Sequence, residues 1–282
     1  MNNIVFLNGQ FVEKSEAKIS VLDRGFLFGD GIYEYIPVYQ SNPFRLKEHI
    51  ERLDLCLDAI RLSKPYDLTK WQSIIDEVIS LNGGGNLSIY IQVTRGCDTV
   101  RNHDYDKNIK PTVLVMASEL SAKVAELNPI KAALLQDIRW QNCHIKSVSL
   151  LGNILLKQQA TAQGFDEAVL YRDDSVTEGT SSNVFMVKDA VIYTPPKSNH
   201  ILSGITRDLL IELANKNGIR VIESKILTQQ LFEADEVWVS SSSREISPIT
   251  KINDKIVANG EIGPISKQMH LAFQRFKESL IE

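Results

Sequence analysis

A lysine among apolar residues is the side chain of this sequence best suited to covalent chemistry. Lys146 joins an expected strand to an expected apolar helix, and Ile145, Val148 and Leu150 can bury it. Burial or a neighbouring cation lets a lysine lose its proton near neutral pH and act as a nucleophile. Because a single lysine is more often a solvated charge, this stretch alone favours the ordinary role.

Two stretches could bind an anion such as a phosphate. Residues 203–207 open an expected helix, where a glycine lets an anion approach free N–H groups and the helix dipole favours negative charge. Residues 240–243 are four serines after an expected strand, and small hydroxyl side chains there can line an anion pocket. Their ordinary roles are an N-cap at Ser203 and a solvated serine loop.

Three charged or titratable residues stand out in expected loops and turns. Arg101 and His103 lie in an expected polar loop, and arginine can hold a carboxylate through two parallel hydrogen bonds. Glu178 lies in an expected turn between strands, where its ordinary role is turn chemistry. The five histidines show no zinc-like spacing, so we expect no metal site.

The composition is that of a globular protein. Of the 282 residues, 43% are hydrophobic, and the net charge of -4 favours neither a nucleic acid nor a membrane as partner. We expect no signal peptide, because the N-terminus lacks a charged segment and a long apolar run. The three scattered cysteines suggest neither a disulfide framework nor a metal site, so we expect a cytoplasmic protein.

The elements that must position these side chains mix helices and strands without a regular rhythm. Apolar spacings of three and four predict helices at 47–62 and 69–81. Further helices are expected at 150–163, 205–217 and 265–280, and strands at 4–7, 10–12, 32–39, 87–94, 111–117, 132–140, 167–171, 183–187, 190–194 and 236–239.

This irregular order predicts the α+β class (mixed α/β) rather than a doubly wound sheet. The chain is long enough for two cores. We expect a small N-terminal domain at 1–118, a polar linker at 119–129 and a larger C-terminal domain at 130–282.

The order of short motifs along the chain is more informative than any one of them. In sequence they are Asp23-Arg24-Gly25 with Phe28 to Glu34, Glu48 to Leu53, Lys146, Thr177-Glu178-Gly179 with Ser182-Asn183, Gly204 to Arg207, and Ala234-Asp235-Glu236. This series resembles the fold-type IV enzymes that use pyridoxal 5′-phosphate (PLP). That family includes D-amino-acid transaminases, branched-chain L-amino-acid transaminases and aminodeoxychorismate lyases.

The resemblance implies a role for each matching residue. Lys146 resembles the lysine that carries PLP as a Schiff base and moves the proton. Glu178 resembles the carboxylate facing the pyridine nitrogen, and Tyr33 resembles the active-site tyrosine. The other implied cofactor-binding residues, mostly around the phosphate, are Arg52, Ser181, Ile205, Thr206, Ser241 and Ser242. The family also implies a homodimer with PLP between the small and large domains.

Within the family, one pair of residues indicates the substrate. Arg101 and His103 resemble the Arg-x-His pair by which D-amino-acid transaminases bind the substrate α-carboxylate. We therefore expect amino transfer between a D-amino acid such as D-alanine and a 2-oxo acid such as 2-oxoglutarate. The alternatives are an aminodeoxychorismate lyase, a branched-chain L-amino-acid transaminase and a catalytically silent PLP-binding protein. Intact Lys146, Glu178 and Tyr33 argue against the silent protein.

Overall fold

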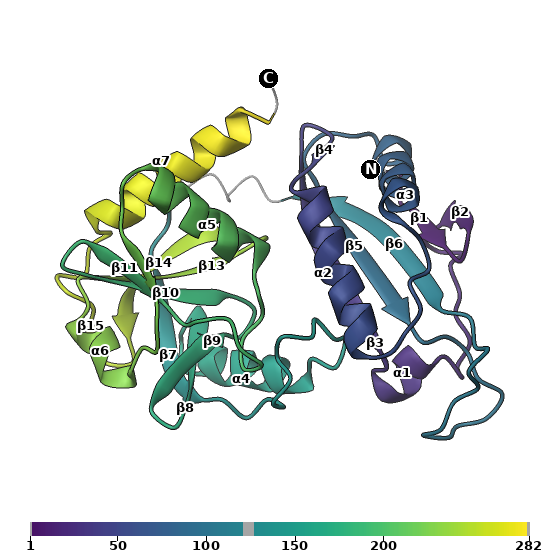
Figure 1. The fold of residues 1–282 in the computed structure, drawn as a ribbon, viewed down its shortest axis with the longest axis horizontal. Helices are drawn as coiled ribbons and strands as arrows, with labels where there is room; N and C mark the ends of the chain where they lie inside the picture. The colour runs from purple at the N-terminus through teal and green to yellow at the C-terminus, as the bar shows by residue number, and fades with distance from the viewer. Residues whose placement is uncertain (1, 121–126, 281–282) are drawn as a thin grey trace. The chain divides into compact units, whose positions relative to one another are not determined.

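The computed structural model describes residues 2–120 and 127–280, and their contacts divide them into two compact units (Figure 1). Unit 1 comprises residues 2–120 together with the later segment Ile145–Leu150. Unit 2 comprises the remaining described residues. The expected linker at 119–129 includes residues 121–126, which lie outside the described residues.

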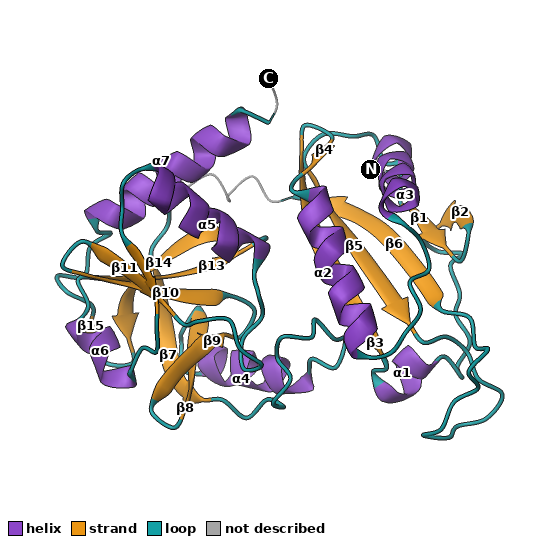
Figure 2. Ribbon diagram, viewed as in Figure 1, coloured by secondary structure: helices purple, strands orange, loops and turns teal. Residues whose placement is uncertain are grey.

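Unit 1 is built on an antiparallel sheet, which in the described residues has six strands in the order β2-β1-β6-β5-β3-β4 (Figure 2). Its elements are β1 (Ile4–Leu7), β2 (Gln10–Glu13), α1 (Arg24–Phe28), β3 (Gly31–Tyr39), β4 (Asn42–Pro43), α2 (Leu46–Ala59), α3 (Leu68–Leu81), β5 (Leu87–Thr94) and β6 (Thr112–Glu119).

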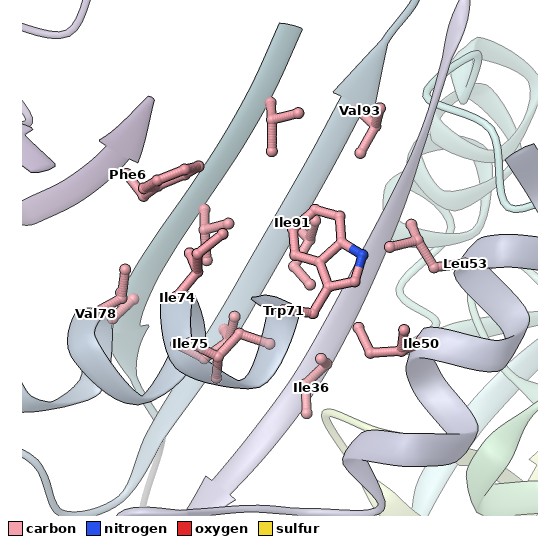
Figure 3. Packing of buried hydrophobic residues seen from close by; sticks show 14 of the residues in the cluster. Phe6, Ile36, Ile50, Leu53, Trp71, Ile74, Ile75, Val78, Ile91 and Val93 are labelled. Carbon is pink, nitrogen blue, oxygen red and sulfur yellow. The ribbon is translucent and has the colours of Figure 1, made fainter. Parts of the chain in front are cut away.

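Helices α2 and α3 cover one face of this sheet with apolar side chains. Helix α2 contacts β3, and α3 contacts β1, β6 and α2. One row of α3 is almost wholly buried: Trp71, Ile74, Ile75 and Val78. Figure 3 shows these side chains packed toward Ile91 of β5. Burying one large apolar side chain stabilises a fold by about 1.5–3 kcal/mol, so this layer holds α2 and α3 on the sheet.

A short segment from later in the chain completes the edge of β3. The Tyr33 N–H donates to the Lys146 carbonyl over 2.9 Å, and the Val148 N–H donates to the Gly31 carbonyl over 3.0 Å. These are the ladder bonds of an antiparallel pair. Residues Ile145–Leu150 are therefore fixed to the sheet of unit 1, and Lys146 with them.

Unit 2 is built on a mixed sheet, which in the described residues has nine strands: β12-β11-β10-β13-β14-β7-β8-β9, with β15 beside β14. Its elements are β7 (Ile130–Gln136), α4 (Leu151–Ala162), β8 (Glu167–Arg172), β9 (Ser175–Gly179), β10 (Asn183–Lys188), β11 (Val191–Thr194), α5 (Ile205–Lys216), β12 (Val221–Glu223), α6 (Thr228–Glu233), β13 (Glu236–Ser241), β14 (Glu245–Ile252), β15 (Lys255–Ile256) and α7 (Pro264–Glu278).

Strands β10 and β13 of unit 2 are largely buried, and their middle residues, 184–187 and 237–239, are continuously apolar. Helix α4 covers β7 and β8 with Leu156 and Ala160. Elsewhere in the sheet, Phe185 of β10 stacks on Trp238 of β13 with ring centroids 5.5 Å apart. Within the described part of the chain, no helix combines the length and apolar character needed to span a membrane.

Three sequence-based expectations about unit 2 need correction. The strand expected at 132–140 ends at Gln136, because the next residues turn into an ion-pair cluster. Glu178 lies inside β9 rather than in a turn. The strand expected at 236–239 continues through Ser240 and Ser241, because both pair with β14. The expected mixed α/β fold class with two separate sheets is confirmed.

Candidate active site

Lys146 places its amine over an aromatic ring of β3. Nζ lies 4.2 Å from the ring centroid of Tyr33, and that ring stacks on Tyr90 with centroids 5.7 Å apart. An ammonium is attracted to the face of such a ring by its quadrupole. Among residues 2–120 and 127–280, no carboxylate forms an ion pair with Lys146. The described contact of the amine is therefore with this ring and not with a counter-ion.

The backbone of Lys146 is fixed from two sides. Its carbonyl accepts the N–H of Tyr33, and its own N–H donates to the sulfur of Cys56 on α2 over 3.4 Å. Burial raises the pKa of the Cys56 thiol, so this sulfur is an uncharged acceptor at neutral pH. The peptide of Lys146 is therefore held in place by its own N–H and carbonyl groups.

A buried carboxylate on β3 connects the strand to α2. Glu34 accepts two hydrogen bonds from Arg52, with Nε at 2.7 Å and Nη2 at 2.8 Å. Nδ1 of His49 lies 2.8 Å from Glu34 Oε2. His49 and Arg52 are three residues apart and share one face of the helix. Glu34 is inaccessible to solvent and Arg52 is only 8% exposed, so this is a desolvated ion pair.

The charges of this cluster are set by burial and pairing together. Burial would raise the pKa of Glu34, but the charge and hydrogen bonds of Arg52 outweigh it and hold the pKa well below its usual range. Burial lowers the pKa of His49 more than Glu34 raises it, so the ring is neutral at pH 7. Burial alone would lower the pKa of Arg52, but the charge and hydrogen bonds of Glu34 more than offset this effect. The pKa of Arg52 is therefore raised. Arg52 is therefore a permanent, rigidly oriented cation.

The expected substrate-binding pair lies elsewhere in unit 1, in the exposed loop 95–111 between β5 and β6. Arg101 Cζ lies 4.8 Å from the ring centroid of Phe28, and the His103 ring centroid lies 5.5 Å from the same ring. Their described contacts are with this ring, not with Lys146 or Tyr33.

In unit 2, a second buried carboxylate lies in a ring of donors. Arg139 Nη1 donates to Glu178 Oε1 over 2.5 Å, and Leu202 N–H donates to Oε2 over 2.9 Å. Asn183 Nδ2 donates to Oε2 over 3.3 Å. Asp137 holds the same arginine through two hydrogen bonds of 2.8 and 2.9 Å. The carboxylate of Glu178 thus has a fixed orientation.

Glu178 differs from Glu34 in its electrostatics. Burial raises the pKa of Glu178, and the opposing charge and hydrogen bonds of Arg139 do not fully offset it, so the pKa rises to about 6. Arg139 is shared with Asp137, whose negative charge also raises the pKa of Glu178. Because the charge of Glu178 is only partly compensated, a further cationic partner would stabilise its ionised form.

The raised pKa of Glu178 makes the stability of the cofactor-free protein pH dependent. A pKa of about 6 in the folded protein, against 4.5 for the unconstrained group, stabilises the fold below pH 4.5. That contribution is lost as the pH rises through 6, and it amounts to about 2 kcal/mol at roughly 1.4 kcal/mol per pKa unit. Urea unfolding should therefore show the wild type losing about this much free energy of unfolding relative to Glu178→Gln between pH 4.5 and 7.5. A difference between the two proteins that does not change with pH would contradict this assignment.

The start of α5 has the form expected of an anion site. Gly204 is the N-cap and, lacking a side chain, does not itself cap the first-turn N–H groups. Ile205 and Thr206 follow and are buried. Asp208 in the first turn is paired with Lys197 over 2.8 Å, which offsets its negative charge. The helix dipole is thus left to favour an anion.

The expected serines lie at the ends of β13 and β9. Ser241 is the last residue of β13, with its Oγ 3.3 Å from that of Ser243, and Ser242 follows in the turn. Ser181 is exposed in the turn after β9. The neighbouring Ser240, which was not singled out from the sequence, is buried, and its Oγ has no hydrogen-bond partner among the described residues.

Three further residues of these clusters could have been found only by weak signals. Glu34 shares one face of β3 with Ile32 and Ile36, and a charge in an apolar row requires a buried partner. Arg139 and Asp137 stand two residues apart after an apolar strand, which is a common surface pattern. The charge of Glu34 in an apolar row can be recognised from the sequence. The spacing of Asp137 and Arg139 does not distinguish them from surface residues.

The chain matches known proteins over nearly its whole length. The family model described as amino-transferase class IV matches residues 31–252. A D-alanine aminotransferase of Staphylococcus haemolyticus is 41% identical over 277 residues, which is 98% of each chain. A D-alanine aminotransferase of Listeria innocua is 40% identical over 272 residues, 95% of this chain and 94% of the relative.

Solved structures agree with this result. The branched-chain amino acid aminotransferase of Escherichia coli superposes with a TM-score of 0.92 at 27% identity, covering 98% of this chain and 94% of that one. A branched-chain amino acid aminotransferase from T.th., solved with pyridoxamine 5′-phosphate, gives 0.90 at 28% identity, with the same coverage. The resemblance drawn from the ordered motifs is confirmed, and the chain belongs to the class IV aminotransferase family.

Proposed function

We propose that this chain is a PLP-dependent transaminase that moves the amino group of a D-amino acid such as D-alanine onto a 2-oxo acid such as 2-oxoglutarate. The observation that carries the proposal is 41% identity, over 98% of both chains, to a relative named D-alanine aminotransferase. The similar structures named branched-chain aminotransferases are 27% and 28% identical. This difference favours the D-amino acid over a branched-chain L-amino acid.

The residues present fit PLP in charge and in donor type. The group needs a lysine amine, a carboxylate for its ring nitrogen and a set of anion donors for its phosphate. Lys146 and Glu178 supply the first two, and the start of α5 supplies N–H groups of the third kind. When bound, PLP stabilises negative charge at the substrate Cα by spreading it into its ring.

Lys146 is the proposed general base and acid. Its Nζ would accept the proton from the substrate Cα and would later return a proton to the adjacent carbon of the cofactor. The hydrogen bonds to Tyr33 and Cys56 fix its peptide, so only the side chain needs to move between the two positions. Holding the reacting groups in one geometry removes much of the entropic barrier to the transfer.

Glu178 is the proposed partner of a protonated ring nitrogen. With a pKa of about 6 it is mostly ionised at pH 7, and a nearby cation would stabilise that charge further. Arg139 and the N–H of Leu202 hold the carboxylate still, so it can accept the ring N–H without reorganisation. This keeps the ring positively charged when negative charge develops at Cα.

The proposed phosphate-binding set combines one fixed cation with hydroxyl and backbone donors. Arg52 supplies a permanent charge whose orientation Glu34 sets. The remaining proposed cofactor-binding residues are Ser181, Ile205, Thr206, Ser241 and Ser242. Charge-assisted hydrogen bonds from arginine to phosphate are about twice as strong as neutral ones, so Arg52 should dominate the set.

Arg101 and His103 are the proposed carboxylate-binding pair, and replacing Arg101 should impair the use of D-alanine. Arg101→Ala removes a fork-shaped cation, so kcat/KM for D-alanine should fall by about 10- to 100-fold, as expected for a lost charge-assisted hydrogen bond. PLP content should not change, because the phosphate set does not include this residue. Steady-state kinetics with D-alanine and 2-oxoglutarate measure the effect.

Lys107→Ala, which removes another exposed cation of the same loop, is the matched control and should keep near-normal kinetics. The unmodified enzyme should prefer D-alanine to L-alanine and L-leucine. Preference for the L-amino acids would defeat the substrate assignment. Efficient release of pyruvate from aminodeoxychorismate without D-alanine turnover would instead support the lyase alternative.

A cytoplasmic homodimer remains part of the proposal. Helix α4 leaves Leu151, Ile154 and Leu155 exposed, and the segment before it leaves Ile138 and Trp140 exposed. Clustered apolar side chains on a surface commonly mark a protein–protein contact. This supports association with a second copy.

A further inference from the structure

Arg24, the first residue of α1, is buried and donates to three consecutive carbonyls of another segment. Its Nη1 lies 2.6 Å from the carbonyl oxygen of Asn102 and 3.5 Å from that of Asp104, and its Nη2 lies 3.0 Å from that of His103. Nε is paired with Asp30 over 3.0 Å, and the side chain is 5% exposed. All three nitrogens of this guanidinium are therefore engaged, most of them with the loop that carries Arg101.

The loop has few other bonds that could give it a fixed conformation. No backbone–backbone hydrogen bond of the described residues reaches residues 98–105. These residues form no helix or strand, and the side chains of Arg101, Asn102 and His103 are exposed. A loop of this kind relies on side-chain donors for its shape. The bonds from Arg24 are the described polar contacts that tie its carbonyls to α1.

A ring one helical turn further along α1 adds a second contact to the same loop. Phe28 lies under three groups: Arg24 Cζ at 4.8 Å, Arg101 Cζ at 4.8 Å and the His103 ring at 5.5 Å. Arginine stacks well on an aromatic face because its guanidinium is planar and weakly hydrated. Arg24 thus holds the loop backbone, while Phe28 contacts the two side chains of the proposed substrate-binding pair.

We propose that Arg24 and Phe28 of α1 are positioning residues for the substrate carboxylate, holding Arg101 and His103 in their binding geometry. This inference rests on the proposed function. Neither residue is proposed to contact the substrate. Arginine is required because one planar fork serves three carbonyls and a carboxylate at once, which a single ammonium cannot do.

The experiment measures KM and kcat for D-alanine in the PLP-loaded enzyme. Arg24→Gln should raise KM about tenfold or more, the size expected when charge-assisted hydrogen bonds that fix a binding group are lost. Because the reacting residues are untouched, kcat and PLP content should change little. Arg24→Lys keeps the charge but not the planar fork of donors. Its KM should therefore lie between those of the wild type and Arg24→Gln.

The matched control is Arg95→Gln. Arg95 is buried and pairs with Asp30 as Arg24 does, over 2.8 Å, and it also contacts the loop by stacking on Tyr105. Its described hydrogen bonds to carbonyls go to Ile60 and Arg61, however, and not to residues 102–104. Arg95→Gln should therefore lower the free energy of unfolding without raising KM as much as Arg24→Gln does. An equal rise in both variants would mean general loosening and would overturn the proposal.

Coupling to Arg101 separates this inference from the proposed function. In an Arg101→Ala background, Arg24→Gln should raise KM by much less than it does in the wild type, because residues that act through one another are not additive. If Arg101→Ala raises KM but Arg24→Gln does not, the inference fails alone. If Arg101→Ala itself has no effect, the proposed carboxylate role fails and the inference falls with it.

If Arg24→Gln does not fold, Phe28→Leu tests whether α1 positions Arg101 and His103. It keeps an apolar side chain on α1 and leaves the hydrogen bonds of Arg24 in place, but it removes the ring under Arg101 and His103. KM for D-alanine should rise, and the rise should again be much smaller in the Arg101→Ala background. An unchanged KM in a folded Phe28→Leu enzyme would overturn the proposal.

Discussion

Replacing Lys146 by alanine is expected to lower transaminase turnover by about 100- to 10,000-fold or more, the contribution typical of a positioned general acid–base group. Its amine lies over the ring of Tyr33, and no described carboxylate forms an ion pair with it. Borohydride reduction of the PLP-loaded wild type should fix the cofactor onto the peptide that contains Lys146. Steady-state kinetics and peptide mapping measure the two effects.

Lys70→Ala, at an exposed lysine of α3 in the same unit, is the control for the loss of a lysine and should keep its activity. Cofactor found on another lysine would overturn the assignment, as would near-normal turnover of Lys146→Ala. Since the backbone of Lys146 is held by its N–H and carbonyl groups, which alanine retains, the variant should fold normally. A loss of activity therefore reports on the amine.

Replacing Arg52 by alanine is expected to destabilise the protein by about 3–5 kcal/mol, because it leaves a buried carboxylate without its charge partner. Glu34 has no solvent exposure, and both of its oxygens accept from this guanidinium. Adding Glu34→Gln should restore much of the stability, because the uncompensated charge is then gone. Denaturant unfolding of the cofactor-free proteins measures this cycle.

The double variant also isolates the proposed phosphate role. It removes the buried charge but does not return a guanidinium, so PLP affinity should stay about tenfold or more below that of the wild type. Arg45→Ala is the control: Arg45 pairs with the partly exposed Glu48 on the same helix, and such pairs contribute about 0–1 kcal/mol. Full stability of Arg52→Ala, or full PLP affinity of the double variant, would contradict the corresponding role.

Regular elements with a strong apolar period were predictable from the sequence. The helices expected at 47–62 and 69–81 are α2 and α3 within a few residues, because their buried rows recur at spacings of three and four. The five-residue α1 was not predicted. It is too short for a period, and its buried residue is the charged Arg24, whose partners are distant carbonyls.

The candidate site was predictable as a set of residues but not as a set of contacts. The position of Lys146 in the motif series singled it out, yet its attachment to the edge of β3 depends on a pairing far along the chain. Likewise, the sequence offers Arg52 as a phosphate ligand without revealing that Glu34 orients it. Long-range pairings of this kind are decided by tertiary packing, which a local pattern does not encode.

The position of Lys146 in the sequence means that its segment is synthesised after the rest of unit 1. A ribosome releases β1 to β6, with α2 and α3, before the segment Ile145–Leu150 that unit 1 takes in. Until that segment emerges, the N–H of Tyr33 and the carbonyl of Gly31 form an open strand edge. Domains fold as units from the N-terminus, so the nascent chain carries a nearly finished unit 1 that lacks its lysine. The Lys146 amine, the proposed base, is thus added to unit 1 last, after translation of the second unit has begun.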